Sequence, residues 1–384
     1  MQSPIKIPFN KPFIVGKELY YISQSVKSGQ IAGDGLFTRK CQKFMEKKFN
    51  ANKILLTTSC TSALEMAAIL CNVSADDEVI LPSFTFVSTA NAFYMRGAKL
   101  IFADIKQETL NIDETMIEDV ITDHSRVIVP VHYAGVSCEM DKIMDIAHRY
   151  NLYVVEDAAQ GVNAQYKGKF LGTIGDIGTY SFHETKNIIC GEGGAIVINN
   201  EALIERTEII RDKGTNRSKF FRGDVDKYTW VDIGSSYLPS DILAAFLYAQ
   251  FENMEIIEEQ RKVIFNYYYE ALTPLAKKGI LKLPLFRSEC NSNNHIFYIL
   301  LEDEQTRDAL MNYLRSSEIL AVFHYLPLHL SPMGRSMGYK EGQFPVTEHI
   351  CKCLLRLPFY YNLSHEEQAK VITCIEHFFK KRKM

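Results

Sequence analysis

The sequence predicts an α/β protein whose mainly parallel sheet is covered by helices on both faces, followed by a smaller α+β domain. Between residues 53 and 200, short aliphatic and β-branched runs alternate with amphipathic stretches. This alternation is typical of parallel sheets, because two parallel strands need a crossover, usually a helix, between them. Beyond residue 273 the order becomes strand, helix, strand, helix, which indicates a second, smaller unit.

The predicted strands of the large sheet are short, nearly continuous apolar runs bounded by polar or glycine-containing turns. They are KILLT (53–57), EVILP (78–82), KLIFAD (99–104), RVIVPV (126–131), LYVVE (152–156) and GAIVI (194–198). Such runs are typical of strands that are buried on both faces. Ligands of these sheets bind beyond the carboxyl ends of the strands, so residues that follow the strands are the candidate functional residues.

The two domains are predicted at 10–245 and 246–384, which agrees with the length of 384 residues. Residues 240–272 read as one long, nearly unbroken helix that joins them. The second domain is predicted to contain strands at 295–302 and 319–325 and a helix at 305–317. A last helix begins at Ser364, which with Glu367 has the spacing of a capping box.

Composition and charge exclude several classes of protein. The net charge is −3 and no basic stripe is present, so duplex nucleic acid is not an expected partner. No apolar run approaches the ~20 residues that span a bilayer, and the N-terminus lacks the apolar core of a signal peptide. The nine cysteines are odd in number and scattered, which predicts reduced thiols and a cytoplasmic protein. Cys351 and Cys353 have no second pair at zinc-site spacing, so no metal is expected.

A strand-end acid and a loop lysine are the first candidates for chemistry. The predicted strand 152–155 runs into Glu156 and Asp157, and a carboxylate in that place is costly unless it is paired. Asp157 could hold a protonated ring nitrogen, or form an ordinary salt bridge or helix cap. Lys186 follows a strand that ends at Ser181, in a loop closed by glycines. Such a lysine forms Schiff bases if its pKa is lowered, although most lysines are merely solvated.

Two further segments follow strand ends. The turn after residues 53–57 is rich in hydroxyls and opens a helix, whose N-terminus could bind phosphate or simply be capped. In SFTFVSTANAF, which follows the strand at 78–82, the aromatic rings could stack on a planar cofactor or pack in the core. The joint order of phosphate turn, aromatic ring, acid and Ser-Phe-x-x-x-Lys is far more specific than any one of them.

With these motifs the chain resembles the nucleotide-sugar aminotransferases, which have the fold type I architecture of pyridoxal-phosphate enzymes. The resemblance extends from FNKP near residue 9 to LPFYYNLS near residue 360, and it is most specific in VVEDAAQ, SFHETKN and GEGGA. GDGLFTRKCQ, PVHYAGVSCEMD and KGTNRSKFFRGDVDKYTW resemble one subgroup, the dTDP-4-amino-4,6-dideoxygalactose transaminases of surface-polysaccharide synthesis.

The resemblance implies a role for each matching residue. Lys186 matches the catalytic lysine that holds pyridoxal 5′-phosphate as an internal aldimine and moves the proton, with pyridoxamine phosphate as the cofactor's second form. Asp157 matches the partner of the ring nitrogen, Gln160 a side chain near the phenolic oxygen, and Phe86 the stacked ring. The expected phosphate ligands are Cys60, Thr61, Ser181 and, across a dimer interface, Ser236. Many members have Gly for Cys60 and Asn for Ser236.

The resemblance also implies substrates and a partner. His183 and His329 match residues near the sugar, and the enzyme is expected to be a homodimer with shared active sites. Basic residues of the segment 213–230 would bind the nucleotide diphosphate of the partner's site, or else form an ordinary basic surface; they are Lys213, Arg217, Lys219 and Arg222. The expected reaction transfers the amino group of L-glutamate to dTDP-4-keto-6-deoxyglucose.

Alternative products and activities remain open from the sequence. The product could carry the amine at carbon 3, have the gluco configuration, or be a UDP sugar. A sugar dehydratase on this scaffold would have histidine in place of Lys186. A non-catalytic pyridoxal-phosphate protein would be expected to have lost Lys186 or Asp157. A nicotinamide-dependent oxidoreductase is disfavoured, because no Gly-x-Gly-x-x-Gly follows a strand of the N-terminal βαβ unit.

Overall fold

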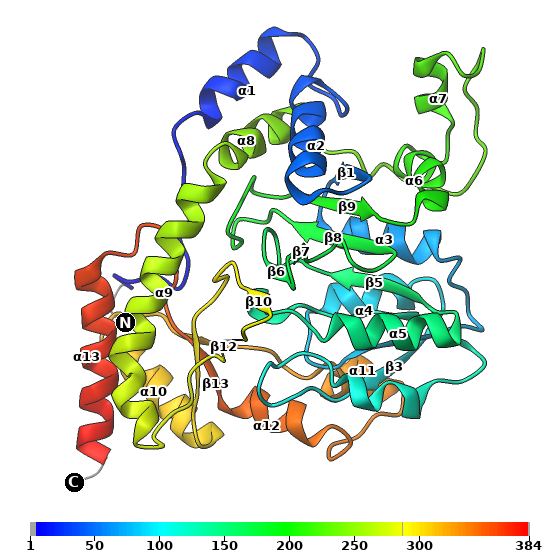
Figure 1. The fold of residues 1–384 in the computed structure, drawn as a ribbon. Coiled ribbons are helices and arrows are strands. Elements are labelled where there is room, and N and C mark those ends of the chain that lie inside the picture. Colours follow the sequence, from blue (N-terminus) through cyan, green and yellow to red (C-terminus); the bar gives the residue numbers. More distant parts are fainter. Residues whose placement is uncertain (1–4, 286, 383–384) are drawn as a thin grey trace.

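The computed structural model describes residues 5–285 and 287–382, and its centre is a seven-stranded sheet (Figure 1). Every neighbouring pair in the sheet is parallel except the two pairs that β9 makes with β1 and β8. The predicted mainly parallel α/β sheet is therefore confirmed. In spatial order the strands are β1 (Lys53–Thr57), β9 (Gly194–Ile198), β8 (Ile177–Ser181), β5 (Tyr153–Asp157), β4 (Ser125–Ile128), β2 (Glu78–Pro82) and β3 (Lys99–Ala103).

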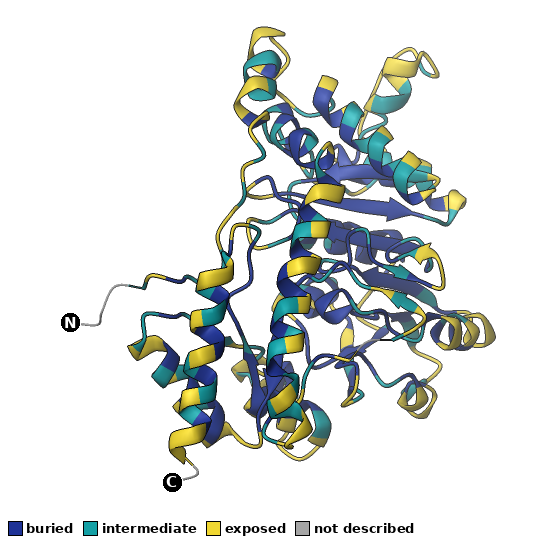
Figure 2. Cartoon of the chain, turned by 60° about the vertical axis from the view of Figure 1, so that its left-hand side comes forward, coloured by how far each residue is buried: buried dark blue, intermediate teal, exposed yellow. Residues whose placement is uncertain are grey.

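Helices cover both faces of this sheet. Alternate residues of β1 enter different apolar clusters: Ile54 and Leu56 belong to one and Leu55 to the other. The first cluster includes side chains of α2 (Leu36–Phe49), α5 (Met140–Tyr150) and α8 (Asp241–Phe251). The second includes side chains of α3 (Cys60–Leu70), α4 (Val87–Tyr94) and α6 (Ile204–Arg211). The strands are consequently buried on both sides (Figure 2).

The joining segment consists of two helices and not one. α8 ends at Phe251 and α9 (Met254–Lys277) begins three residues later, so the expectation of one nearly unbroken helix over 240–272 was wrong at Glu252 and Asn253. Ser240 caps α8 by accepting a hydrogen bond from the Leu243 N–H at 3.4 Å. α9 contributes Ile257 to the core of the large sheet.

Further along, α9 contributes Ile264, Phe265 and Leu272 to the core of the C-terminal part. α9 therefore runs from one core into the other (Figure 1). The domain boundary at residue 245 stays a prediction.

The C-terminal part has its own antiparallel sheet of β11 (Tyr298–Leu300), β13 (Leu354–Arg356) and β12 (Val322–Phe323). It is flanked by α10 (Glu304–Ser316), α12 (Pro345–Cys353) and α13 (His365–Arg382). The predicted capping box of α13 is confirmed: the Ser364 N–H donates to Glu367 at 2.9 Å, and the Glu367 N–H donates to Ser364 Oγ at 3.1 Å.

The remaining elements are short or peripheral. The helices are α1 (Glu18–Lys27), α7 (Arg217–Arg222) and α11 (Pro332–Ser336), and the short strands are β6 (Gln165–Tyr166), β7 (Lys169–Phe170) and β10 (Cys290–Asn291). Single 3-10 turns lie at Glu114–Met116, Glu118–Val120, Tyr133–Gly135, Glu201–Leu203 and Leu328–Leu330. Among the residues that the structure describes, none of the helices combines the length and apolar character needed to cross a membrane. Within the same residues, no three His, Cys, Asp or Glu side chains gather as metal ligands.

Candidate functional site

A cavity of about 530 Å³ lies at the carboxyl ends of the parallel strands. Its lining comes from segments that follow β1, β2, β5 and β8, which is the edge of the sheet where α/β proteins bind their ligands. The C-terminal part closes it from the other side. The cavity brings together eight of the residues selected from the sequence: Cys60, Thr61, Phe86, Asp157, Gln160, Ser181, His183 and Lys186.

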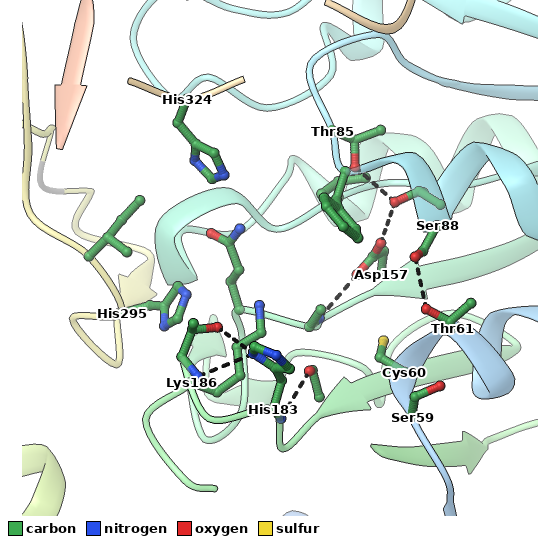
Figure 3. A pocket seen from close by; sticks show the side chains of 18 of the residues that line it. Ser59, Cys60, Thr61, Thr85, Ser88, Asp157, His183, Lys186, His295 and His324 are labelled. Carbon is green, nitrogen blue, oxygen red and sulfur yellow. Dashed lines mark hydrogen bonds between the residues drawn. The ribbon is translucent and has the colours of Figure 1, made fainter. Parts of the chain in front are cut away.

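Lys186 projects into this cavity from the loop between β8 and β9 (Figure 3). The loop is held by backbone bonds, since the Lys186 N–H donates to the His183 carbonyl at 2.9 Å and the Cys190 N–H donates to the Phe182 carbonyl at 2.8 Å. Burial lowers the pKa of Lys186 from its ordinary value of 10.5, although the nearby Cys60 and Asp157 counteract this change. A larger fraction of the amine is therefore neutral and nucleophilic than in a solvated lysine.

Asp157 is the last residue of β5 and is only 5% exposed. Its Oδ2 accepts a hydrogen bond from the Thr89 hydroxyl at 2.7 Å, and its Oδ1 accepts one from the Ala159 N–H at 3.1 Å. The Thr85 hydroxyl lies 2.8 Å from that of Thr89 (Figure 3). A carboxylate has about four acceptor positions, so Asp157 is oriented by two protein donors and can still accept an N–H from a ligand.

The N-terminus of α3 forms one end of the cavity. The Ser59 hydroxyl caps the helix by accepting the Ser62 N–H at 3.0 Å, and the N–H groups of Cys60 and Thr61 have no partner within a helix that begins there. A Cβ atom on Gly194 would lie 2.3 Å from the Ser59 carbonyl carbon, so only glycine lets β9 pass this close. This turn is a ready anion site.

Two other predicted residues line the cavity, one with an exposed side chain and one with a buried side chain. Phe86 precedes α4 and is 58% exposed, so its ring is open to a stacking partner. Gln160 is buried and hydrogen-bonded at both amide atoms: its Oε1 accepts the Ala134 N–H at 2.7 Å, and its Nε2 donates to the Tyr325 hydroxyl at 3.0 Å. Gln160 thereby ties the loop after β5 to the C-terminal part of the chain.

The residues of this cavity fit pyridoxal phosphate. They supply a lysine with a lowered pKa, an oriented acid, a helix N-terminus against a glycine, and an open aromatic ring. Lys186 and Asp157 line the same cavity, with Ser59, Cys60 and Thr61 on one side and two histidines on the other (Figure 3).

Four polar cavity residues come from the C-terminal part and were not singled out in the sequence: His295, His324, Tyr325 and Arg356. Burial lowers the pKa of both histidines well below 6.5, so both rings are neutral near pH 7. His324 Nδ1 lies 2.9 Å from the Tyr133 hydroxyl, and His295 Nδ1 lies 2.9 Å from Asn187 Oδ1. In the segment FHYLPLH it is His324, and not the selected His329, that lines the cavity.

His329, the histidine that was selected from that segment, lies elsewhere. It is fully buried, with Nδ1 2.7 Å from Ser83 Oγ and Nε2 3.1 Å from Glu348 Oε1. Both ring nitrogens are therefore occupied, and the structure does not support the predicted contact with a sugar. His183, by contrast, lines the cavity, with Nδ1 2.9 Å from the Thr185 hydroxyl.

The basic segment stands away from the cavity of its own chain. α7 projects from the large domain (Figure 1). Ser236, which follows the end of α7 by 14 residues, is exposed. The four basic side chains are paired with acids: Lys213 and Arg217 with Asp212, Lys219 with Glu205, and Arg222 with Glu208 and Asp224. Their role in a neighbouring subunit's site stays a prediction.

The fold and this cavity define a fold type I pyridoxal-phosphate-dependent transferase. The chain belongs to the DegT/DnrJ/EryC1/StrS aminotransferase family, which it matches over residues 12–376. This confirms the expected family of sugar aminotransferases and its cofactor, pyridoxal phosphate.

Individual relatives agree with this assignment. The chain is 30% identical to the GDP-perosamine synthase of Escherichia coli O157:H7 over 377 residues, covering 97% of this chain and 98% of that protein. It is 35% identical to the pleiotropic regulatory protein of Geobacillus stearothermophilus over 322 residues, 83% of each chain. The crystal structure of an aminotransferase from Psychrobacter cryohalolentis is similar with a TM-score of 0.91 and 25% identity, covering 99% of both chains.

Proposed function

We propose that this enzyme transfers the amino group of L-glutamate to carbon 4 of dTDP-4-keto-6-deoxyglucose, giving dTDP-4-amino-4,6-dideoxygalactose for surface-polysaccharide synthesis. The observation that carries the transaminase assignment is the placement of Lys186 and Asp157 on one cavity at the strand ends. The choice of sugar is supported by the subgroup motifs, such as GDGLFTRKCQ and PVHYAGVSCEMD.

The residues of the cavity would hold the cofactor at three points. The N-terminus of α3 and Ser181 would bind its phosphate, Asp157 its ring nitrogen, and Phe86 the face of its ring. When bound, pyridoxal phosphate supplies an aldehyde that captures amines and a ring that accepts an electron pair. Asp157, held by Thr89, would keep the ring nitrogen protonated.

Lys186 is the proposed acid and base of both half-reactions. In the first half-reaction, the Nζ of Lys186 would take a proton from the α-carbon of the amino donor and hand it to the bound cofactor. In the second half-reaction, it would take a proton from the cofactor and hand it to the carbon of the sugar that receives the amino group. Burial, which lowers the pKa of Lys186, favours the neutral amine that can accept this proton. The neutral His295 and His324 line the same space, where they can donate to or accept from sugar hydroxyls without adding charge.

The test uses purified holoenzyme, L-glutamate and a panel of keto sugars. We expect formation of 2-oxoglutarate and, from dTDP-4-keto-6-deoxyglucose, a 4-amino galacto product in the NMR spectrum. Lys186→Ala should abolish turnover, whereas the exposed Lys169→Ala should not change it. Full turnover by Lys186→Ala would refute the mechanism. A 3-amino, gluco-configured or UDP-linked product would correct the substrate, and a deoxygenated product would identify a dehydratase.

A non-catalytic role is the second candidate, because one relative is named a pleiotropic regulatory protein. It predicts that the chain binds pyridoxal phosphate but turns over no keto sugar of the panel. The presence of both Lys186 and Asp157 in the cavity favours catalysis.

The proposed homodimer has its active sites at the subunit interface, where Ser236 and the basic segment would reach the neighbouring cavity. Mixed dimers test this: Lys186→Ala and Lys219→Glu/Arg222→Glu chains would each be inactive alone, but mixing them would create one intact site. Activity rising toward a quarter of the wild-type value supports the shared site. No recovery in dimers whose mixing is verified by mass spectrometry contradicts it.

A further inference from the structure

Two neutral histidine rings line the cavity from the C-terminal part, and each has one nitrogen without a partner. The Nδ1 atoms of His295 and His324 lie against Asn187 and Tyr133, whereas neither Nε2 atom is hydrogen-bonded to any of the described residues. A neutral imidazole has one N–H donor and one acceptor nitrogen, and the partner of one nitrogen sets the state of the other. The residues beside Nδ1 therefore decide what each Nε2 offers to a ligand.

Asn187 makes His295 a hydrogen-bond acceptor. It directly follows Lys186 in the chain and is buried. Its Nδ2 donates to the Asn293 carbonyl at 2.8 Å, and a carbonyl only accepts, so the orientation of the Asn187 amide is fixed. The Oδ1 of Asn187 lies 2.9 Å from His295 Nδ1, which must carry the proton that this oxygen accepts. The Nε2 of His295 therefore keeps a lone pair and acts as an acceptor.

Tyr133 gives His324 the opposite role. Burial raises the pKa of the Tyr133 hydroxyl well above its usual value of 10, so the hydroxyl keeps its proton. Among the described residues, the one hydrogen-bond partner of this hydroxyl is His324 Nδ1, at 2.9 Å. A buried O–H without an acceptor is costly, so Tyr133 donates to Nδ1. The proton of the neutral His324 ring then lies on Nε2, which acts as a donor.

Both rings lie close to the reacting amine. The charge of Lys186 contributes to the lowered pKa of each ring, and His295 contributes to the lowered pKa of His324. The backbone before His295 is held in place, because Asn293 Nδ2 donates to the Gln160 carbonyl at 2.9 Å. One acceptor and one donor are thus fixed beside Lys186, on the side of the cavity away from the N-terminus of α3 (Figure 3).

We propose that Asn187 and Tyr133 are positioning residues that give His295 and His324 opposite hydrogen-bonding roles, so that the two rings together recognise a hydroxyl of the acceptor sugar next to its reacting carbon. This inference rests on the proposed function. A hydroxyl donates one hydrogen bond and accepts others, so it satisfies both rings. A carbonyl cannot donate to His295, and an ammonium cannot accept from His324. In dTDP-4-keto-6-deoxyglucose this hydroxyl is the one on carbon 3, because carbon 5 carries the ring oxygen and the methyl group.

The first experiment observes the two tautomers in the holoenzyme by NMR of nitrogen-labelled histidine. The variants His295→Phe and His324→Phe assign the two rings among the ten histidines of the chain. We expect the ring proton of His295 on Nδ1 and that of His324 on Nε2. In Asn187→Leu the ring proton of His295 should move to Nε2, because Nδ1 has lost its acceptor. A wild-type His295 with its proton on Nε2 would overturn the inference.

The second experiment measures the acceptor half-reaction of enzyme reconstituted with pyridoxamine phosphate. It compares the second-order rate constants for dTDP-4-keto-6-deoxyglucose and for its 3-deoxy analogue. The ratio of the two constants is the readout, because general damage to the fold slows both sugars alike. Tyr298→Phe is the matched control for Tyr133→Phe: Tyr298 is also buried, its ring centroid lies 6.0 Å from that of Tyr133, and it does not line the cavity.

We expect wild type to prefer the 3-hydroxy sugar about 100-fold or more, since a site built around a hydroxyl leaves its buried polar groups unpaired when the hydroxyl is missing. Asn187→Leu and Tyr133→Phe should each lower this preference to about tenfold or less, whereas Tyr298→Phe should keep the wild-type ratio.

A wild-type ratio near one, or a ratio that stays at the wild-type value in both Asn187→Leu and Tyr133→Phe, would overturn the inference and leave the transaminase function intact. If another keto sugar of the panel is the substrate, the same comparison uses that sugar and its analogue without the hydroxyl beside the keto carbon. Wild-type enzyme that aminates no keto sugar would instead refute the proposed function, and the inference with it.

Discussion

The hydroxyl of Thr89 is expected to set the orientation of Asp157, and Thr89→Val removes it at nearly constant shape. The two side chains are almost completely buried, and Thr89 donates to Asp157 Oδ2 at 2.7 Å. Because that proton is used, the 2.8 Å contact between the two threonine hydroxyls requires Thr85 to be the donor to Thr89. Valine therefore breaks two hydrogen bonds, one of them to a carboxylate.

The expected loss of stability follows from the negative charge of the Asp157 carboxylate that accepts the hydrogen bond. A hydrogen bond to a charged group contributes about 1.5–3 kcal/mol to folding, and at about 2 °C per kcal/mol the apoenzyme should unfold about 3–6 °C lower. Asp157 would keep only the Ala159 N–H as a fixed donor. With its orientation loosened, we expect pyridoxal phosphate to bind about tenfold more weakly, which corresponds to about 1.4 kcal/mol.

The assays are thermal unfolding of the apoenzyme by circular dichroism and cofactor titration by absorbance. Thr89→Ser is the control, because it keeps the hydroxyl and loses only a methyl group. A double-mutant cycle with Asp157→Asn isolates the pairwise interaction. If Thr89→Val and Thr89→Ser have the same cofactor affinity, or if the cycle gives no coupling, the reasoning about Thr89 is wrong.

Three further predictions concern Lys186, Gly194 and Glu258. The rate constant for capture of pyridoxal phosphate by the apoenzyme should rise with pH and reach a plateau below pH 10.5, because burial lowers the pKa of Lys186 and the neutral amine reacts. A rate constant that reaches its plateau only above pH 10.5 in stopped-flow measurements would contradict this. Gly194→Ala should weaken cofactor binding at least about tenfold, because the added Cβ would lie 2.3 Å from Ser59 and 2.4 Å from Cys60 and would displace α3. If a soluble Gly194→Ala variant bound the cofactor with unchanged affinity in a titration, the inferred close approach would be refuted. Burial raises the pKa of Glu258 from 4.5 to about 7, so the folded state binds more protons than the unfolded state in that range and stability is lost as pH rises through it. Glu258→Gln, which can keep the hydrogen bond from Asn163, should therefore gain about 1–3 kcal/mol relative to wild type between pH 5 and pH 8 in thermal scans, and a constant difference would show that Glu258 does not titrate there.

The sequence alone determined the central sheet and the half of the site that belongs to it. The apolar runs at 53–57, 78–82 and 194–198 are the strands β1, β2 and β9, because a short apolar run bounded by turn residues is typical of a strand that is buried on both faces. Residues at or shortly after the ends of such strands, including Asp157 and Lys186, line one cavity at the edge of the sheet, because the carboxyl ends of parallel strands lie together. The capping box of α13 is equally local.

Only the tertiary structure decided which residues of the C-terminal part complete the cavity. His324 and His329 belong to one short motif, yet one faces the cavity and the other is buried between Ser83 and Glu348, because the packing of the two parts sets their orientation. Arg356 is one strand-end arginine among many basic residues until the fold shows that it lines the cavity. Contacts between residues far apart in the chain depend on how the core of the large sheet packs against the core of the C-terminal part, and local sequence patterns do not predict that packing.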